Sequence, residues 1–326
     1  MDSSDSPRLG WIGLGSMGLA MAVNIQKHIQ QQQGRLPPLK YWNRTLARGK
    51  PLQDLGAMAC AKIADLVQTC DVIFISVSDD TALTSITTSI QSSGSIASKI
   101  FVDTTTIHPS TTTSICASFV DQKATYLAAP VFGATPVAEA GKLLVALAGD
   151  PAAISTISPF LTGVIARRVI QVGTTPSQAL LLKTTSNFLT AGLMTLFSEA
   201  HTLAEKTGLP SHILEDLVEE NFGAYCLGVS RRLTSGTYFP AEGQAPPSGL
   251  ELGIKDVGHA VGLARENDMQ LRIGAMYLEA AEEAKKYGEE RGRRCDSSAI
   301  FGVVRQRAGL GFENEAVKER DGSTRQ

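Results

Sequence analysis

The chain has 326 residues, of which 43% are apolar and 19% charged, which is the balance of a globular protein with two domains. Its formal net charge of −2 excludes a general electrostatic attraction to nucleic acid or to an anionic membrane. No apolar run reaches the ~18 residues of a membrane span, and the N-terminal segment carries Asp2 and Asp5 in place of a basic, apolar leader. We therefore expect a cytoplasmic protein that binds neither nucleic acid nor membranes.

The first half of the chain alternates short apolar runs with helical patterns, which is typical of a parallel sheet with helices on both faces. The first apolar run is followed directly by a helical pattern over 17–29. The predicted strands are Leu9–Gly13, Leu39–Asn43, Met58–Ala61, Asp71–Val77, Lys99–Thr104, Tyr126–Val131, Leu143–Ala148 and Val169–Val172.

Strand patterns then stop, and Ser177–Lys206 reads as one helix of ~45 Å, which suggests a spine between two domains. We place the boundary near Gly173, with a Rossmann dinucleotide-binding domain over 1–173 and a helical C-terminal domain over 174–326. The charged tail after Phe312 is expected to be disordered. The other predicted helices are Ile213–Asn221, Leu250–Asn267, Arg272–Glu290 and Ser298–Ala308, interrupted by a Pro/Gly-rich loop over 240–249.

A glycine-rich turn lies between the first strand and the first helix. Gly13-Leu14-Gly15-Ser16-Met17-Gly18 fits GxGxxG, and the strand before it and the helix after it give the pattern meaning. Gly13 permits the tight turn, Gly15 lets the backbone approach a pyrophosphate, and Gly18 lets helix and strand pack closely. The free N–H groups of the helix N-terminus would bind the phosphates. The alternative is a glycine-rich turn of another α/β fold.

The second strand ends at Asn43-Arg44-Thr45, where an NAD-specific site would place a carboxylate for the ribose 2′-hydroxyl. A guanidinium suits a 2′-phosphate instead, because arginine forms bidentate, charge-assisted hydrogen bonds. We therefore favour NADP(H) over NAD(H), the alternative being that Arg44 is an ordinary solvated side chain.

Four segments together resemble the β-hydroxyacid dehydrogenase family, which includes 3-hydroxyisobutyrate dehydrogenases and glyoxylate/succinic semialdehyde reductases. The resemblance implies a Rossmann domain, a long interdomain helix and a helical C-terminal domain through which two chains form a homodimer. The matching segments are the turn at 13–18 with Met21-Ala22-Val23-Asn24, then 103–109 (Asp-Thr-Thr-Thr-Ile-His-Pro), then 129–133 (Ala-Pro-Val-Phe-Gly) with Gly141-Lys142-Leu143, and last Lys183 with Asn187 and Lys255-Asp256.

Lys183 and Asn187 share one face of the long helix because they are four residues apart, and the run around them is apolar. Hydride transfer to a carbonyl leaves negative charge on oxygen, which a lysine can neutralise with a proton. The resemblance gives Lys183 this general acid/base role and makes Asn187 an orienting residue. The alternative for Lys183 is a lysine that extends its amine from a helix edge into water.

Further roles follow from the resemblance alone. Lys255 is expected to contact the cofactor and Asp256 to support the substrate site, the alternative being an exposed charge pair. Thr105 is expected to face the substrate and Thr106 the nicotinamide, the alternative being a Thr-rich turn. Val77 and Ser78 would lie over the adenosine and ribose of the dinucleotide.

The chain departs from the family pattern on the substrate side. Family members commonly carry Ser-Gly-Gly where this chain has Phe132-Gly133-Ala134, and an aromatic residue where it has Ser248. Because a phenyl ring donates no hydrogen bond, either backbone N–H groups of this segment hold a substrate carboxylate or the substrate is bulkier and less acidic.

The leading hypothesis is an NADPH-dependent enzyme that interconverts a small β-hydroxy acid or alcohol and its aldehyde or ketone. The second is an imine reductase on the same scaffold, which Lys183 disfavours because such relatives usually carry a different residue there. A catalytically silent dinucleotide-binding scaffold is the third, and the presence of the lysine argues against it.

Overall fold

The computed structural model describes residues 6–323, so Asp2 and Asp5 lie outside the described part. The chain divides into two compact units, Met1–Lys183 and Thr184–Gln326. Over residues 6–323, every helix is too short or too polar to cross a membrane.

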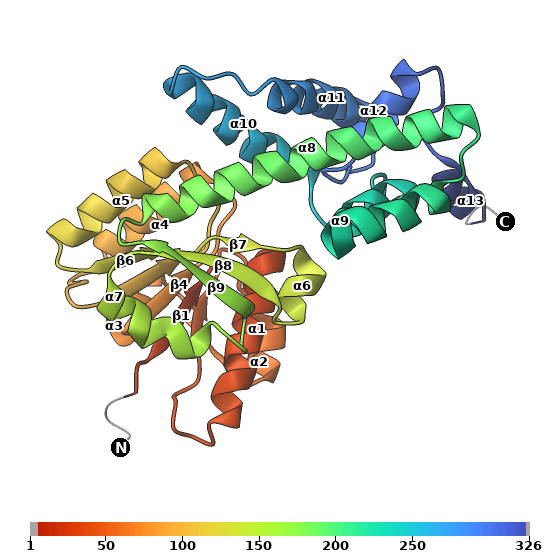
Figure 1. The fold of residues 1–326 in the computed structure, drawn as a ribbon. Coiled ribbons are helices and arrows are strands. Elements are labelled where there is room, and N and C mark those ends of the chain that lie inside the picture. Colours follow the sequence, from red (N-terminus) through yellow and green to blue (C-terminus); the bar gives the residue numbers. More distant parts are fainter. Residues whose placement is uncertain (1–5, 324–326) are drawn as a thin grey trace. The chain divides into compact units, whose positions relative to one another are not determined.

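The first unit is built around one sheet, drawn in red to green in Figure 1. Its strands follow the order β3-β2-β1-β4-β5-β6-β8-β7, and β9 pairs with β8. The strands from β3 to β6 in this order are parallel to one another, as predicted for a Rossmann domain. The strands are β1 (Leu9–Ile12), β2 (Lys40–Trp42), β3 (Met58–Ala59), β4 (Val72–Ile75), β5 (Ile100–Asp103), β6 (Thr125–Ala128), β7 (Val131–Phe132), β8 (Leu143–Ala148) and β9 (Ala166–Gly173).

The sheet is parallel except at one edge, where β8 runs antiparallel to both β6 and β7. The single strand predicted over 126–131 is in fact two strands, β6 and β7. Pro130 separates them because proline has no N–H for the ladder. Its carbonyl still accepts a hydrogen bond from the N–H of Ala146 at 3.0 Å, which keeps the chain beside β8.

The central strands are buried on both faces, which explains their continuous apolar sequences. Trp11 of β1 and Phe74 of β4 stack on one face with ring centroids 5.4 Å apart. Ile12 and Ile75 belong to the hydrophobic cluster on the other face. The helices of this unit are α1 (Ser16–Gln31), α2 (Lys50–Asp54), α3 (Ile63–Thr69), α4 (Asp80–Gln91), α5 (Pro109–Asp121), α6 (Thr135–Glu139) and α7 (Pro151–Ile157), with 3₁₀ turns at Leu46–Gly49 and Ser158–Phe160.

The predicted long helix is confirmed as α8 (Ser177–Thr207), drawn in green in Figure 1. Its first turns belong to the first unit, because Ala179 and Leu180 are fully buried in that unit's hydrophobic cluster. The first unit therefore extends along α8 to Lys183, beyond the predicted boundary near Gly173.

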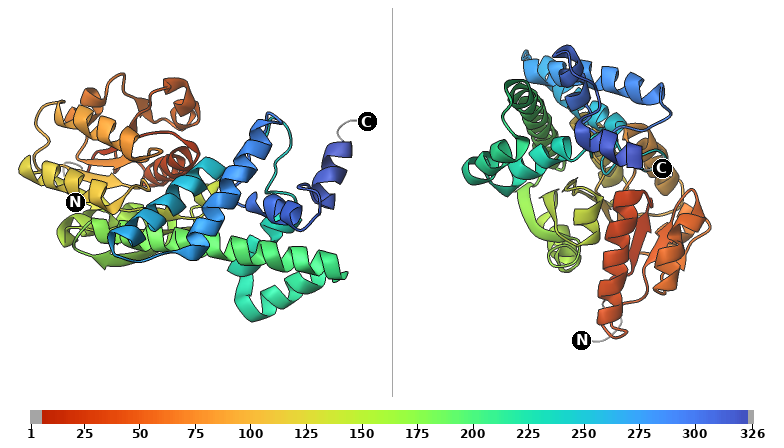
Figure 2. Two further views of the ribbon diagram at one scale, coloured as in Figure 1. Left: turned by 90° about the horizontal axis from the view of Figure 1, so that it is seen from above. Right: turned by 90° about the vertical axis from the view of Figure 1, so that its right-hand side faces the viewer.

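The second unit is helical, as predicted, and α10 and α11 pack side by side (Figures 1 and 2). The first of its helices runs far beyond the predicted 213–221, because Gly223, with φ +78°, bends it without ending it. Buried aromatic residues, among them Tyr238, Phe239 and Phe301, form the core. The helices after α8 are α9 (Ser211–Thr234), α10 (Leu250–Glu266), α11 (Arg272–Glu289), α12 (Ile300–Arg307) and α13 (Glu315–Ser323).

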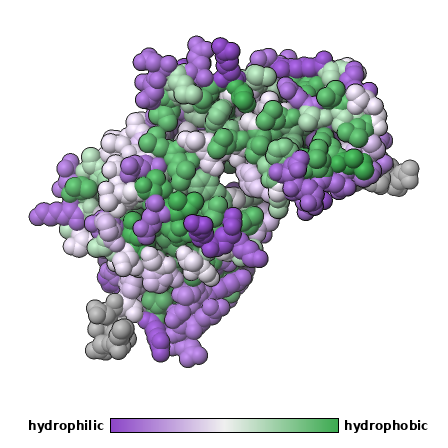
Figure 3. All heavy atoms as spheres, in the orientation of Figure 1, coloured by the Kyte–Doolittle hydropathy of each residue, from purple (hydrophilic) through white to green (hydrophobic). Residues whose placement is uncertain are grey.

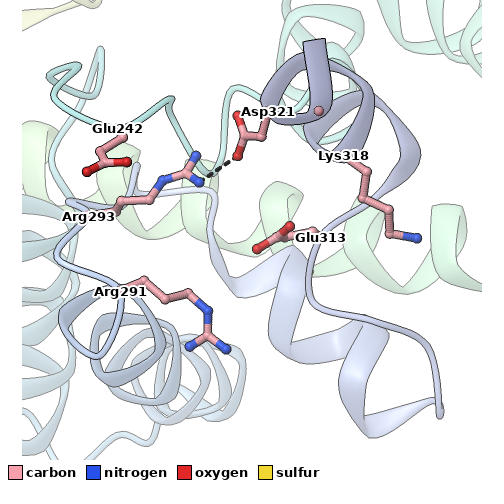
Figure 4. A pocket seen from close by; sticks show the side chains of 7 residues that line it. Glu242, Arg291, Arg293, Glu313, Lys318 and Asp321 are labelled. Atoms are coloured by element: carbon pink, nitrogen blue, oxygen red, sulfur yellow. Dashed lines mark hydrogen bonds and ion pairs between the residues drawn. The ribbon is translucent and has the colours of Figure 1, made fainter. Parts of the chain in front are cut away.

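The prediction of a disordered tail after Phe312 is wrong, because Glu315–Ser323 forms α13. Val317 of this helix is fully buried. The Arg293 guanidinium pairs with the Asp321 carboxylate at 2.6 Å, as Figure 4 shows. Both side chains line a cavity of about 430 Å³ together with Glu242, Arg291, Glu313 and Lys318. Its mixed charges and the Arg293–Asp321 pair indicate that these side chains hold α13 in place.

Candidate functional site

The turn between β1 and α1 can be built only with glycine at two of its positions. Gly13 has φ +95°, and a Cβ on it would lie 2.2 Å from the carbonyl oxygen of Ser76. A Cβ on Gly18 would lie 2.3 Å from the carbonyl oxygen of Gly13. These contacts bring the start of α1, the end of β1 and the loop after β4 together, as the GxGxxG pattern predicts.

The same turn leaves room for a phosphate group. A Cβ on Gly15 would have no heavy atom within 4 Å, so the space beside its backbone is open. Gly15 is also the N-cap of α1, and among residues 6–323 no side chain caps this helix. The N–H groups of the first turn are therefore available to an anion. Open space and available donors together fit the pyrophosphate of a dinucleotide.

The end of β2 is tied to this turn by the Asn43 side chain. Its Oδ1 accepts a hydrogen bond from the Leu14 N–H at 2.9 Å, and its Nδ2 donates to the Thr45 carbonyl at 2.8 Å. Asn43 therefore positions the turn. Arg44 and Thr45 are exposed beside it, and Arg48, a second exposed arginine that the sequence reasoning missed, follows in the 3₁₀ turn Leu46–Gly49. The signal for Arg48 was its position one helical turn after Arg44.

The ends of β4 and β5 are joined through Thr105. Its N–H donates to Asp103 Oδ1 at 2.9 Å, and its hydroxyl oxygen accepts from the Val77 N–H at 3.2 Å. Thr105 is 2% exposed. We expected its side chain to face the substrate, but its hydrogen bonds lie within this edge of the sheet. Thr106 is half-buried, and Ser78 is exposed with its hydroxyl 2.6 Å from Asp79 Oδ2.

Asp103 lies behind this edge and was missed as a site residue. It is fully buried, and its Oδ2 accepts a hydrogen bond from the Tyr126 hydroxyl at 2.7 Å. Burial raises the pKa of this carboxyl to about 6, against the lowering effect of hydrogen bonds from Thr105 and Tyr126. An aspartate at the end of an apolar strand was the available signal. Asp103 is a positioning residue for Thr105.

Lys183 lies two turns into α8, where its ammonium stands over the Phe132 ring at 4.9 Å from the centroid. Both residues belong to the first unit. Leu182 and Phe132 pack partly buried against the hydrophobic cluster that contains Leu180. Lys183 is therefore a half-buried cation in apolar and aromatic surroundings.

The second unit holds the remaining predicted residues in one chain of contacts. Asp256 Oδ2 accepts a hydrogen bond from Asn187 Nδ2 at 2.8 Å, and Asp256 Oδ1 pairs with Lys255 Nζ at 2.8 Å. Asp256 thus contacts two predicted site residues, one on α8 and one on α10. Ser248 lies outside this group, where its N–H donates to Asp296 at 3.0 Å.

A glycine-rich turn with open space and available N–H donors, between the first strand and first helix of a parallel sheet, is the arrangement of a dinucleotide-binding domain. Residues 8–173 match the NAD-binding domain of 6-phosphogluconate dehydrogenase. Two relatives of known sequence and one solved structure extend the likeness over nearly the whole chain.

The chain is 29% identical to the NADH-dependent oxidoreductase ucdB of Aspergillus ustus, over 91% of this chain and 98% of that protein. It is 27% identical to glyoxylate/succinic semialdehyde reductase 1 of Arabidopsis thaliana, over 86% of this chain and 93% of that protein. Its fold is that of Mycobacterium tuberculosis 3-hydroxyisobutyrate dehydrogenase, whose structure was solved with L-serine. The TM-score is 0.76 at 19% sequence identity, over 92% of this chain and 99% of that chain. The chain belongs to the β-hydroxyacid dehydrogenase family, and it is an NAD(P)-dependent dehydrogenase or reductase.

Proposed function

We propose that this enzyme interconverts a small alcohol or β-hydroxy acid and the corresponding aldehyde or ketone, with Lys183 as the general acid and base. The observation that carries the proposal is the half-buried Lys183 ammonium in apolar surroundings, four residues before Asn187 on α8. Glyoxylate and succinic semialdehyde, which the Arabidopsis relative is named for, are carbonyl compounds of the kind that such a proton donor serves.

The bound nicotinamide supplies a hydride to the carbonyl carbon, or takes one from the alcohol carbon in the reverse direction. In the reductive direction Lys183 Nζ gives a proton to the carbonyl oxygen as negative charge develops there, and the neutral amine is then reprotonated from water. The Asn187 amide donates to Asp256, so its carbonyl oxygen can accept a hydrogen bond from the lysine ammonium or from a substrate hydroxyl.

The proposed cofactor is NADP(H). Arg44 and Arg48 are exposed and follow the end of β2, where this chain carries Asn43 and no carboxylate. Two guanidinium groups suit a 2′-phosphate, whereas an NAD site would use a carboxylate on the ribose hydroxyls. The Aspergillus relative is named as NADH-dependent, so cofactor choice is a property to be measured on this chain.

The proposed assembly is a homodimer formed through the helical unit. Leu189, Leu196 and Leu203 are each more than half exposed in the single chain and repeat every seven residues along α8. Figure 3 shows hydrophobic residues gathered over the helices of this unit. An exposed apolar stripe with heptad spacing suits packing against another helix, and a second copy of α8 offers the matching stripe.

Replacement of the lysine tests the proposed reaction. In Lys183→Ala we expect kcat for aldehyde reduction to fall about 10²- to 10⁴-fold, the usual contribution of a general acid, while NADPH still binds in a fluorescence titration. Lys183→Arg is the matched variant, because it keeps the positive charge but holds its proton too tightly to give it up. An unchanged kcat in both variants would contradict the mechanism. Faster turnover of a cyclic imine than of any aldehyde by the wild-type enzyme would favour imine reduction.

A further inference from the structure

Phe132 and Lys183 form the wall of the first unit that faces the proposed reacting carbonyl. The lysine ammonium lies 4.9 Å from the ring centroid, which is the distance and position of a cation–π contact. Because the proposed proton donor stands over this ring, a substrate group beside the reacting oxygen lies next to Phe132 as well.

The ring is held in place by the strand that carries it. Phe132 pairs with Leu144 in the antiparallel ladder between β7 and β8. The next residue, Gly133, has φ +134°, and a Cβ on it would lie 2.8 Å from Leu143 Cδ2. The backbone can therefore leave the strand in this direction only with glycine, which fixes the end of β7 and the ring on it.

The segment 132–134 contributes no side-chain hydrogen-bond donor to this wall, where the family pattern would place a serine. Phe132, Gly133 and Ala134 carry only hydrocarbon side chains or none. The face of an aromatic ring carries negative electrostatic potential, so it attracts the ammonium and repels a carboxylate. An apolar or aryl substituent would instead pack on the ring edge, which favours edge-to-face contacts.

We propose that Phe132 selects a neutral carbonyl substrate with an apolar or aryl substituent within a few carbons of the reacting group, and discriminates against a substrate with a carboxylate at that place. The proposal rests on the proposed role of Lys183, and it names the substrate class of that same site. Of the two possibilities that the Phe132-Gly133-Ala134 segment left open, it takes the bulkier and less acidic substrate.

A matched pair of aldehydes tests the proposal on the wild-type enzyme. Succinic semialdehyde and 4-methylpentanal share the same two-methylene spacer after the aldehyde carbon, and the spacer carries a carboxylate in the first and an isopropyl group in the second. NADPH oxidation is followed with each, and with 3-phenylpropanal as the aryl member. We expect kcat/KM for the neutral aldehydes to exceed that for succinic semialdehyde at least tenfold, because transfer of a charge to this wall costs more than transfer of an isopropyl group.

Phe132→Ser supplies the matched variant, because it adds a donor and removes the ring. We expect its ratio of kcat/KM for 4-methylpentanal over succinic semialdehyde to fall at least tenfold, with NADPH binding unchanged. A wild-type enzyme that prefers succinic semialdehyde overturns the proposal, and this comparison needs no variant to fold. An unchanged ratio in a folded Phe132→Ser enzyme overturns it too. If no aldehyde is reduced, the proposed reaction itself has failed, which is a different outcome.

Discussion

The side-chain amide of Asn187 donates a hydrogen bond to the carboxylate of Asp256, with 2.8 Å between Nδ2 and Oδ2. A carboxylate can only accept, so this bond fixes which end of the amide is nitrogen and leaves the Asn187 oxygen to accept other hydrogen bonds. Asp256 also pairs with Lys255. We interpret Asp256 as a positioning residue that sets the orientation of Asn187.

Asp256→Asn should lower kcat about 10- to 100-fold, which is the effect of losing one charge-assisted hydrogen bond of about 1.5–3 kcal/mol. An asparagine can donate as well as accept, so Asn187 is no longer held in one orientation. KM for NADPH should change much less than kcat. Lys255→Met is the comparison variant, because it removes the ion pair and leaves the Asn187–Asp256 bond in place; its expected loss of a cofactor contact raises KM for NADPH, which Asp256→Asn should not do. A kcat equal to wild type in Asp256→Asn would show that the orientation of Asn187 does not matter.

The parts of the fold that local sequence determines could be predicted. Gly13 and Gly18 mark the first turn because their Cβ atoms would meet backbone oxygens, and α8 follows from its helical pattern. The antiparallel edge could not be predicted, because strand direction depends on which strands pair and not on their composition. Nor could α13, because the buried Val317 and the Arg293–Asp321 pair that hold it involve residues far apart in the sequence.

In the candidate site, too, the features set by local sequence could be predicted, and those set by contacts between distant residues could not. The cofactor turn has a spacing that sequence alone displays, whereas Asp103 gains its role from Tyr126, which reaches it from the neighbouring strand β6. Phe132 was visible as a departure from the family pattern. Its contact with Lys183 became visible only in the structure, because more than fifty residues separate the two in the sequence.

Arg44→Ala should weaken NADPH binding about 10- to 100-fold and leave NADH binding nearly unchanged. The lost interaction is a charge-assisted contact with the 2′-phosphate, of about 1.5–3 kcal/mol. Titration of each dinucleotide by fluorescence measures both affinities. Arg35→Ala is the matched control, since Arg35 is also exposed but precedes β2, whereas Arg44 follows it. Equal weakening of NADPH and NADH would mean that Arg44 does not contact the 2′-phosphate.

Leu196→Asp should convert the proposed dimer into a monomer. It places a carboxylate in the middle of the exposed leucine stripe of α8, and a charge buried there without a partner costs several kcal/mol. Sedimentation equilibrium measures the mass. Val120→Asp is the matched control, because Val120 is 59% exposed on α5 in the first unit. A wild-type monomer, or a Leu196→Asp dimer, would contradict assembly through this stripe.

The buried carboxyl of Asp103 should make the first unit less stable as pH rises from about 4 to 6. Burial raises its pKa to about 6 from the ordinary 3.8, so in this range the folded chain keeps a proton that the unfolded chain releases. Stability from this group is therefore fully present below pH 3.8 and lost as pH rises through 6. The difference corresponds to about 3 kcal/mol, at 1.36 kcal/mol for each pKa unit.

Asp103→Asn removes this titration and keeps an acceptor for the Thr105 N–H. Between pH 4 and 7 the free energy of unfolding of wild type should therefore fall by about 2 kcal/mol relative to that of the variant. Urea unfolding followed by tryptophan fluorescence measures it, because both tryptophans, Trp11 and Trp42, lie in the first unit. Asp71→Asn is the control of opposite sign. A hydrogen bond from Arg8 lowers the pKa of Asp71, so the free energy of unfolding of wild type should rise relative to that of the variant as pH rises. If the Asp103→Asn difference stays constant from pH 4 to 7, Asp103 keeps an ordinary pKa and the buried network does not hold its proton.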